Sequence, residues 1–149
     1  MPTVKRVPTL MAHVIELSHT MREADVTEVA LLGYNPRQAL ELSYLLSKKC
    51  WTYIEDGKVL CIVGITKAPD DNNTGIPWML ATEEAFSNKA RFLRANSPML
   101  EELSQGYSGL WNIVHKGNRK AIRWLEWLGF EFKQAWSHED FYEFYKECN

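Results

Sequence analysis

The order of apolar and polar positions predicts a chain of mixed strands and helices. Residues 12–17 alternate between apolar and polar side chains, which predicts a strand. Thr20 and Glu23 then have the spacing of a capping box, in which each side chain satisfies a free backbone amide of the other. The pattern predicts a helix over 21–32 that stops at Gly33.

A second helix start follows at once. Asn35 can cap the helix, Pro36 suits its first position, and Gln38 occupies the third. The leucines that follow predict a helix that ends near residues 48–49. Beyond it, two apolar runs at 50–54 and 59–65 flank an Asp-Gly pair, which strongly favours a β-hairpin.

The rest of the chain gives four more strands and two helical regions. A polar stretch over 68–75 is predicted as a loop. The elements after it are a strand over 76–81, a helical region from Ser87 or Asn88 to Gln105 with a break at Ser97-Pro98, a strand over 110–115, a helix over 119–128 ended by Gly129, and strands over 130–136 and 141–146.

The predicted order is therefore β-α-α-β-β-β-α-β-α-β-β. Its central β-α-β-α-β stretch favours parallel neighbours within a mixed sheet. We expect a single α/β domain over residues 1–149, with a mixed central sheet and helices on both faces.

Composition and charge narrow the function classes. Of the 149 residues, 46% are hydrophobic and 24% are charged, which is typical of a globular domain and not of a disordered chain. The net charge of −2 gives no general attraction to nucleic acid, so a nucleic-acid partner is not expected. No apolar run is long enough to span a membrane, and no signal peptide is recognised at the start. The three cysteines and four histidines lack the spacing of metal ligands, so no metal is expected.

One segment carries a resemblance to a known superfamily. In residues 118–130, Asn118 opens a helix, Ala121 follows three positions later, and Leu128-Gly129-Phe130 closes it. Together with the order of elements, this segment resembles the late helix of the GNAT acetyltransferases. The resemblance implies a GNAT-like domain, acetyl-CoA as the cofactor, and transfer of an acetyl group to an amine.

A narrower resemblance rests on the C-terminal half. Residues 110–114, then Gly117-Asn118, Ile122-Arg123 and Leu125, resemble the small internal virion proteins of short-tailed bacteriophages. Those proteins are acetyltransferase-like in fold and are linked to assembly of the phage particle. This resemblance implies a virion or host protein as partner, and a location in the host cytoplasm or the virion rather than secretion.

The GNAT resemblance places the cofactor at the turn after the fourth strand. It implies that cofactor contacts come from Leu80, Ala81, Thr82, Phe86, Ser87, Asn88, Lys89 and Asn118. The family's turn carries glycines that let the backbone wrap a pyrophosphate, whereas residues 82–90 contain none and include Glu83 and Glu84. The acetyl-CoA site is therefore expected to be degenerate, and the simpler interpretation is that Ser87 or Asn88 only caps a helix.

The catalytic groups of the family are also incomplete. The late helix often carries a tyrosine acid seven residues after its Asn, and Leu125 stands at that position. The candidates for the base are His115, at a strand end, and Glu83. A lone histidine at a strand end is more often a surface or hydrogen-bonded residue than a base.

The sequence leaves three functions open. The first is a GNAT-fold phage component that acts in the virion or in its assembly, with a degenerate acetyl-CoA site. The second is an active N-acetyltransferase with a divergent cofactor turn. The third is a small module that binds a host protein. Acetyl-CoA binding separates the second from the others, and the sequence leaves the oligomeric state open.

Overall fold

Seven strands form one mixed sheet in the computed structural model of the chain, which describes residues 4–87 and 97–148. Their order across the sheet is β1-β2-β3-β4-β5-β7-β6. The strands are β1 (Val4–Pro8), β2 (Lys49–Glu55), β3 (Lys58–Ala68), β4 (Asp71–Ala81), β5 (Gly109–His115), β6 (Glu131–Gln134) and β7 (Phe141–Glu147).

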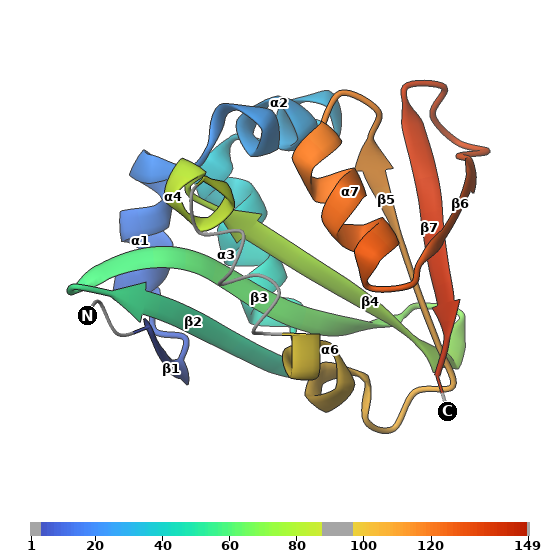
Figure 1. Cartoon of the computed structure of the whole chain (residues 1–149), viewed down its shortest axis with the longest axis horizontal. Coiled ribbons are helices and arrows are strands. Elements are labelled where there is room, and N and C mark those ends of the chain that lie inside the picture. The colour runs from blue at the N-terminus through green and yellow to red at the C-terminus, as the bar shows by residue number, and fades with distance from the viewer. Residues whose placement is uncertain (1–3, 88–96, 149) are drawn as a thin grey trace.

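Among these described strands, only one pair of neighbours is parallel. β4 and β5 run in the same direction, and every other pair in the sheet is antiparallel. The parallel pairing is also short, because it joins only Thr74 with Gly109 and Gly75 with Leu110. Beyond these residues the two strands diverge, as Figure 1 shows. The sheet therefore opens between β4 and β5.

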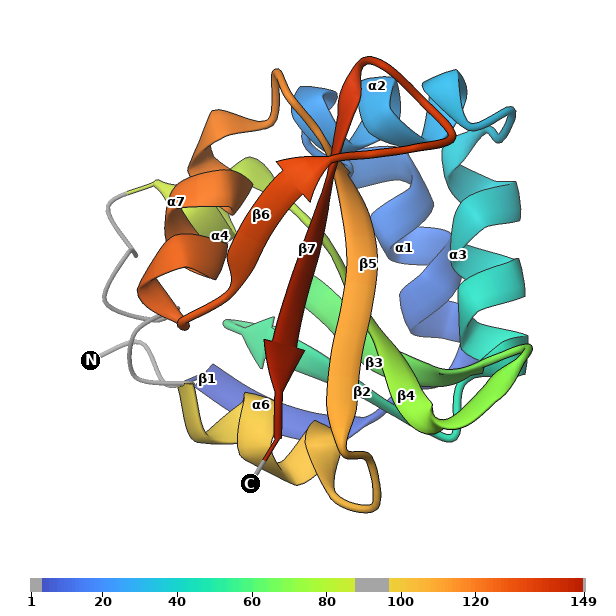
Figure 2. The ribbon, with the colours of Figure 1, turned by 90° about the vertical axis from the view of Figure 1, so that its right-hand side faces the viewer.

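Helices cover both faces of the sheet, as expected for the predicted α/β class. They are α1 (Met11–Thr20), α2 (Glu23–Leu31), α3 (Pro36–Leu46), α4 (Glu83–Phe86), α6 (Ser97–Ser104) and α7 (Arg119–Trp127). Figure 2 shows α1, α2 and α3 on one side of the sheet and α4, α6 and α7 on the other. Each side has its own apolar core, one around Leu40 and Ile62 and the other around Leu60 and Phe144.

Two local predictions are confirmed in detail. Asn35 and Gln38 form the expected capping box at the start of α3, because each side chain accepts the backbone N–H of the other. Between β2 and β3, Asp56 and Gly57 both have positive φ angles, of 51° and 75°. These are the conformations that a tight two-residue hairpin turn requires.

The predicted strand over 12–17 is wrong, because these residues lie within helix α1. The buried side chains are Val14 and Leu17, and Met21 packs against the same core. Their spacing of three and four residues is the period of a helix, and an alternation over six residues is too short to exclude it. The first strand of the sheet is instead β1, at Val4–Pro8.

The expected capping box at Thr20 and Glu23 does not form. The Thr20 hydroxyl donates to the Glu16 carbonyl in the last turn of α1, and α2 begins later, at Glu23. The predicted loop over 68–75 is also wrong in part, because β3 extends to Ala68 and β4 begins at Asp71. These polar residues form the exposed end of a long hairpin.

The helical region predicted from Ser87 or Asn88 is only partly described. Helix α4 starts earlier, at Glu83, and Ser87 comes directly after its last residue. Asn88 and Lys89 lie outside the described residues. Helix α6 begins at Ser97, so Pro98 lies in its first turn, where a missing N–H costs no helical hydrogen bond. Gly106, with a φ of 92°, follows the end of the helix as predicted.

Candidate functional site

A cavity of about 160 Å³ lies where β4 and β5 diverge. Most of its wall is apolar and comes from the strands and from α6 and α7. The polar side chains that line it include Asp25, Glu28, Asn112 and Asn118. An apolar cavity with a few convergent polar groups is the usual form of a binding site. This cavity is therefore the candidate site.

The end of β4 is bonded to the beginning of α2. Leu80 pairs with Ile62 of β3, so Ala81 directs its backbone N–H and C=O toward the other edge of β4. The Ala81 N–H donates to Asp25 Oδ2 at 2.9 Å, and the Ala81 C=O accepts the Arg22 N–H at 2.9 Å. Both backbone groups of Ala81 are thus used within the protein.

The side chain of Asn112 joins the two diverging strands. Its Nδ2 donates to the Pro77 carbonyl of β4 at 2.8 Å, and its Oδ1 accepts the Ile113 N–H of β5 at 2.7 Å. At the end of β5, the His115 N–H donates to Glu28 Oε1 at 2.8 Å. The Pro77 carbonyl and the N–H groups of Ile113 and His115 therefore have side-chain partners from the same chain.

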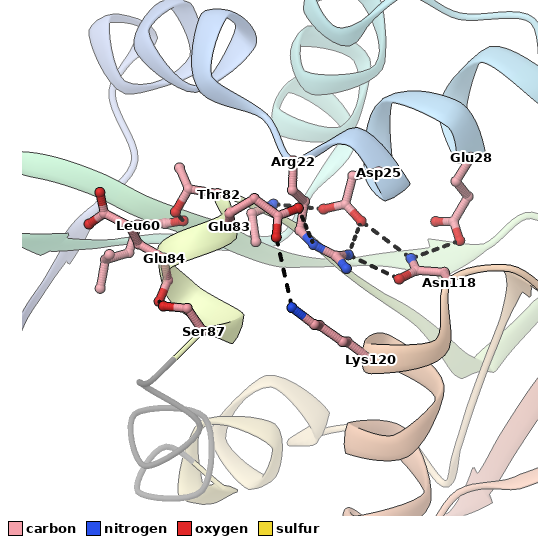
Figure 3. Close-up of polar contacts among 11 residues, drawn as sticks. Arg22, Asp25, Glu28, Leu60, Thr82, Glu83, Glu84, Ser87, Asn118 and Lys120 are labelled. Atoms are coloured by element: carbon pink, nitrogen blue, oxygen red, sulfur yellow. Dashed lines mark hydrogen bonds and ion pairs between the residues drawn. The ribbon is translucent and has the colours of Figure 1, made fainter.

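Four residues from α2, its N-terminal boundary and the start of α7 form one network (Figure 3). Arg22 Nη1 donates to Asp25 Oδ1 at 2.8 Å and to Asn118 Oδ1 at 3.0 Å. Asn118 Nδ2 donates to Asp25 Oδ1 and to Glu28 Oε1, each at 3.3 Å. Asn118 is 2% exposed and precedes α7, but its side chain makes no cap there. It joins α7 to α2 instead.

The electrostatics of the network are set by burial. Desolvation raises the pKa of Asp25 to about 6, although the charge of Arg22 opposes the shift. Desolvation also raises the pKa of Glu28 to about 7; the hydrogen bond from His115 opposes the shift, and the nearby Asp25 adds to it. Glu28 is therefore a carboxyl group that changes charge close to neutral pH.

Arg22 also faces the turn between β4 and α4. Its guanidinium lies 4.3 Å from the centre of the Phe86 ring, and its Nε is buried without a hydrogen bond to any described residue. The Glu83 carboxylate lies 3.8 Å from Arg22 Nε and 3.9 Å from Lys120 Nζ. Glu83 thus lies between two cations, with its side chain 60% exposed.

The other residues predicted at the turn make structural contacts. The Thr82 hydroxyl donates to the Leu60 carbonyl at 2.8 Å, and the Thr82 N–H bonds the same oxygen. Phe86 is buried with its ring against Trp124, and the Ser87 hydroxyl donates to the Glu84 carbonyl. Thr82 thus bonds the start of α4 to β3, and Phe86 packs α4 against α7.

His115 joins the network through its backbone. Its N–H is bonded to Glu28, while the centre of its ring lies 5.5 Å from that of Phe141. Glu83 and His115, the two candidates for the base, are therefore held at different parts of the network, Glu83 by Arg22 and His115 by Glu28. Their catalytic roles stay predictions.

Sequence reasoning missed Arg22, Asp25 and Glu28. Their spacing of three residues places them along one side of a helix, and Asp25 is buried together with Val29. The apolar pattern alone favours Val26, Val29 and Ala30 as the inner face of this helix. The i, i+3, i+6 spacing of the charged residues, next to a valine, is the sequence feature that could have indicated them. The same spacing is common on solvent-exposed helix faces.

The described residues contain no group of three or more His, Cys, Asp or Glu side chains that could hold a metal ion. Within residues 4–87 and 97–148, no helix has both the length and the hydropathy to cross a bilayer.

Comparison with known proteins identifies the fold. No family model and no curated protein matches the sequence. Solved structures do match. They include the GNAT domain of S. lividans PAT, with a TM-score of 0.71, 11% identity, and coverage of 99% of this chain and 90% of that one. An acetyltransferase from Thermus thermophilus matches with a TM-score of 0.71, 12% identity, and coverage of 98% and 97%.

A third match is a GNAT-family acetyltransferase from Bacillus anthracis, with a TM-score of 0.66, 12% identity, and coverage of 95% and 92%. All three likenesses extend over nearly the whole of both chains. At identities this low, they establish the fold and leave the activity open. The chain therefore has the GNAT acetyltransferase fold.

Proposed function

We propose that this chain is a GNAT-fold component of a bacteriophage particle or of its assembly, with a degenerate acetyl-CoA site, and that it acts by binding a virion or host protein. It would be made in the host cytoplasm and act there or in the virion. The phage assignment rests on the sequence resemblance at residues 110–125. The loss of the cofactor site rests on the bonding of β4.

The proposal depends most on the hydrogen bonds that the Ala81 backbone makes within the protein. A cofactor held along the open edge of β4 needs free backbone N–H and C=O groups there. The Ala81 N–H donates to Asp25, and the Ala81 C=O accepts the Arg22 N–H. Leu80 is paired with β3, and the Thr82 N–H is bonded to Leu60. The backbone amides of residues 80–82 are thus already engaged within the protein, which supports a degenerate acetyl-CoA site.

The turn after β4 supports the same conclusion. No glycine occurs between Gly75 and Gly106, so every residue there carries a side chain that limits close approach to a pyrophosphate. Glu83 and Glu84 place two carboxylates in the first turn of α4. Leu125 lines the cavity at the position of the family's acid, and a leucine cannot donate a proton to a leaving thiolate.

Exposed apolar side chains support a protein partner. Leu10 and Leu45 are 58% and 71% exposed, and they lie on α1 and α3 or directly beside them. The two helices pack together. Trp136, in the turn between β6 and β7, is 94% exposed. Large apolar side chains in contact with water are common where a second protein binds.

The alternative function is an active N-acetyltransferase, and one observation favours it. Glu28 lines the cavity and has a pKa of about 7, which suits a general base for an amine. Transfer by direct attack of a well-positioned amine needs no separate acid. The alternative requires acetyl-CoA to enter the cavity and the contacts of Ala81 to open.

A thermal-shift titration with acetyl-CoA separates the two functions. For the proposed function, we expect no change in Tm up to millimolar acetyl-CoA. A ligand at 100 times its Kd would add about 2.7 kcal/mol of stability. In a domain of this size that corresponds to a rise of roughly 5–10 °C. Such a rise, reduced in Asn118→Ala but kept in the exposed control Asn72→Ala, would establish the alternative.

The partner is tested on phage particles. Quantitative mass spectrometry of particles purified on a density gradient is expected to find this chain at a fixed number of copies per particle. A chain that is abundant in the infected lysate but absent from the particles and from their assembly intermediates would contradict the proposal.

A further inference from the structure

Helix α2 is attached to the ends of both diverging strands by two carboxyl groups one turn apart. Asp25 Oδ2 accepts the Ala81 N–H of β4 at 2.9 Å. Glu28 Oε1 accepts the His115 N–H of β5 at 2.8 Å. Figure 3 shows both side chains pointing from α2 toward Asn118. The helix thus spans the opening between the strands and lies over one end of the cavity.

The charges around these carboxyl groups do not balance. Arg22 Nη1 contacts Asp25 and Asn118, and it is the buried cation of the network. Glu28 receives two neutral donors, the His115 N–H and Asn118 Nδ2. With both carboxyl groups ionised, two negative charges therefore face one positive charge in a largely dry site.

Within the described residues, the neighbouring elements do not supply the missing cation. On α4, Glu83 adds a negative charge 3.8 Å from Arg22 Nε. On α7, Lys120 pairs with Glu83 at 3.9 Å. On β3, Cys61 is a buried thiol whose pKa is raised by desolvation and further by Asp25. On β5, His115 turns its ring to Phe141.

We propose that α2 is a pH-dependent clasp, held across the ends of β4 and β5 in mildly acidic solution and released at the Glu28 side in mildly alkaline solution. Protonated Glu28 still accepts both N–H groups through Oε1, and it carries no charge for Asp25 to repel. When Glu28 loses its proton to water, repulsion from Asp25 and the cost of an unpaired, desolvated charge favour its movement into solvent. The His115 N–H is then freed and the cavity opens.

Release of the clasp as the pH rises agrees with the pKa of about 7 for Glu28. Release at higher pH, and not at lower pH, follows from the surplus negative charge, because removing the proton of Glu28 increases that surplus. The clasp involves only described residues of this chain, and it holds or fails whether or not acetyl-CoA binds.

Amide exchange measured by NMR on the full chain tests the clasp. Exchange rates of the Ala81 and His115 amides are recorded from pH 5.5 to 8 and corrected for the intrinsic effect of pH. We expect the protection of the His115 amide to fall by roughly tenfold or more across pH 7, since one unit of pKa difference is a tenfold change in an equilibrium. The Ala81 amide, whose acceptor Asp25 is paired with Arg22, should lose less of its protection from exchange.

Two variants make the result specific. In Glu28→Gln, which keeps an acceptor oxygen and removes the charge, the protection of the His115 amide should no longer depend on pH. The matched control Glu23→Gln removes an exposed carboxylate from the same helix and should behave like the wild type. Equal protection of His115 at pH 6 and pH 8 in the wild type would overturn the proposal, as would an unchanged pH dependence in Glu28→Gln. The wild-type series decides even if a variant does not fold.

Discussion

Replacing Arg22 with Met is expected to lower the free energy of unfolding by about 3–5 kcal/mol at pH 7.5. Methionine fills a similar volume but removes the buried cation that faces Asp25 at 2.8 Å and the Phe86 ring at 4.3 Å. Asp25 would then be a desolvated carboxyl group without the buried positive charge that now faces it. Urea denaturation followed by circular dichroism measures the loss, which is a large part of the stability of a typical domain.

The loss should depend on pH in a defined direction. Near pH 5 both carboxyl groups of the network are mostly protonated, so the variant should be less destabilised there than at pH 7.5. Arg37→Met is the matched control, since Arg37 forms an exposed ion pair with Glu41 and should contribute under about 1 kcal/mol. A loss for Arg22→Met as small as that of the control would show that the network does not stabilise this end of the sheet.

Replacing Glu28 with Gln is expected to stabilise the protein above neutral pH. The folded state holds the proton of Glu28 up to about pH 7, whereas the ordinary pKa of a glutamate is 4.5. Between these values the folded state binds more protons than the unfolded state, so wild-type stability falls as the pH rises through this window. The fall from this one group is on the order of 3 kcal/mol, and stability is level above it. Glu28→Gln removes this contribution.

Tm measured every half unit from pH 4.5 to 8.5 tests this prediction. The variant should lose most of the decline seen in the wild type and be more stable than it at pH 8. Glu23→Gln, on the exposed side of the same helix, should follow the wild-type curve. If Glu28→Gln were less stable than the wild type at pH 8, the ionised form of Glu28 would be favourable in the folded state, which would contradict the expected repulsion from Asp25.

The local signals in the sequence predict much of the fold. Asp56-Gly57 and Asn35-Pro36 act within a few residues of chain, so the hairpin and the start of α3 can be found without tertiary contacts. Helix α1 is not predicted, because a short alternation of apolar and polar residues fits a strand as well as a helix. Its inner face, Val14 and Leu17, is defined by packing against Leu40 and Ile62.

The site is less accessible to sequence reasoning. The resemblance singles out Ala81 and Asn118 as cofactor contacts, and that role stays a prediction. Asn118 is also expected to cap a helix, but its side chain makes no cap there. Asp25 meets Ala81 across 56 positions and Asn118 across 93, and Glu28 meets His115 across 87. No local pattern marks such contacts. They exist only because β4 and β5 diverge and α2 lies across the opening.

Under the proposed function, these contacts take the place of a bound cofactor at the divergence of β4 and β5. Open strand edges can be satisfied either by a bound molecule or by the protein itself. Here Asp25, Asn112 and the Arg22 N–H satisfy groups at the β4 edge, and Glu28 satisfies the His115 N–H at the end of β5. A fold that keeps its sheet and layers while bonding these backbone groups internally can serve as a scaffold for protein binding.

An amide spectrum of the labelled chain, recorded with and without about 5 mM acetyl-CoA at about pH 6, is the sharpest test of the proposed degenerate site. A ligand with a millimolar Kd would be largely bound at that concentration. At that pH the clasp is expected to be closed. Because Ala81 and His115 donate to Asp25 and Glu28, we predict that their amide signals do not move when acetyl-CoA is added. Saturable shifts of both signals, together with those of other residues lining the cavity, would show that the cofactor displaces these contacts, and would contradict the proposed function.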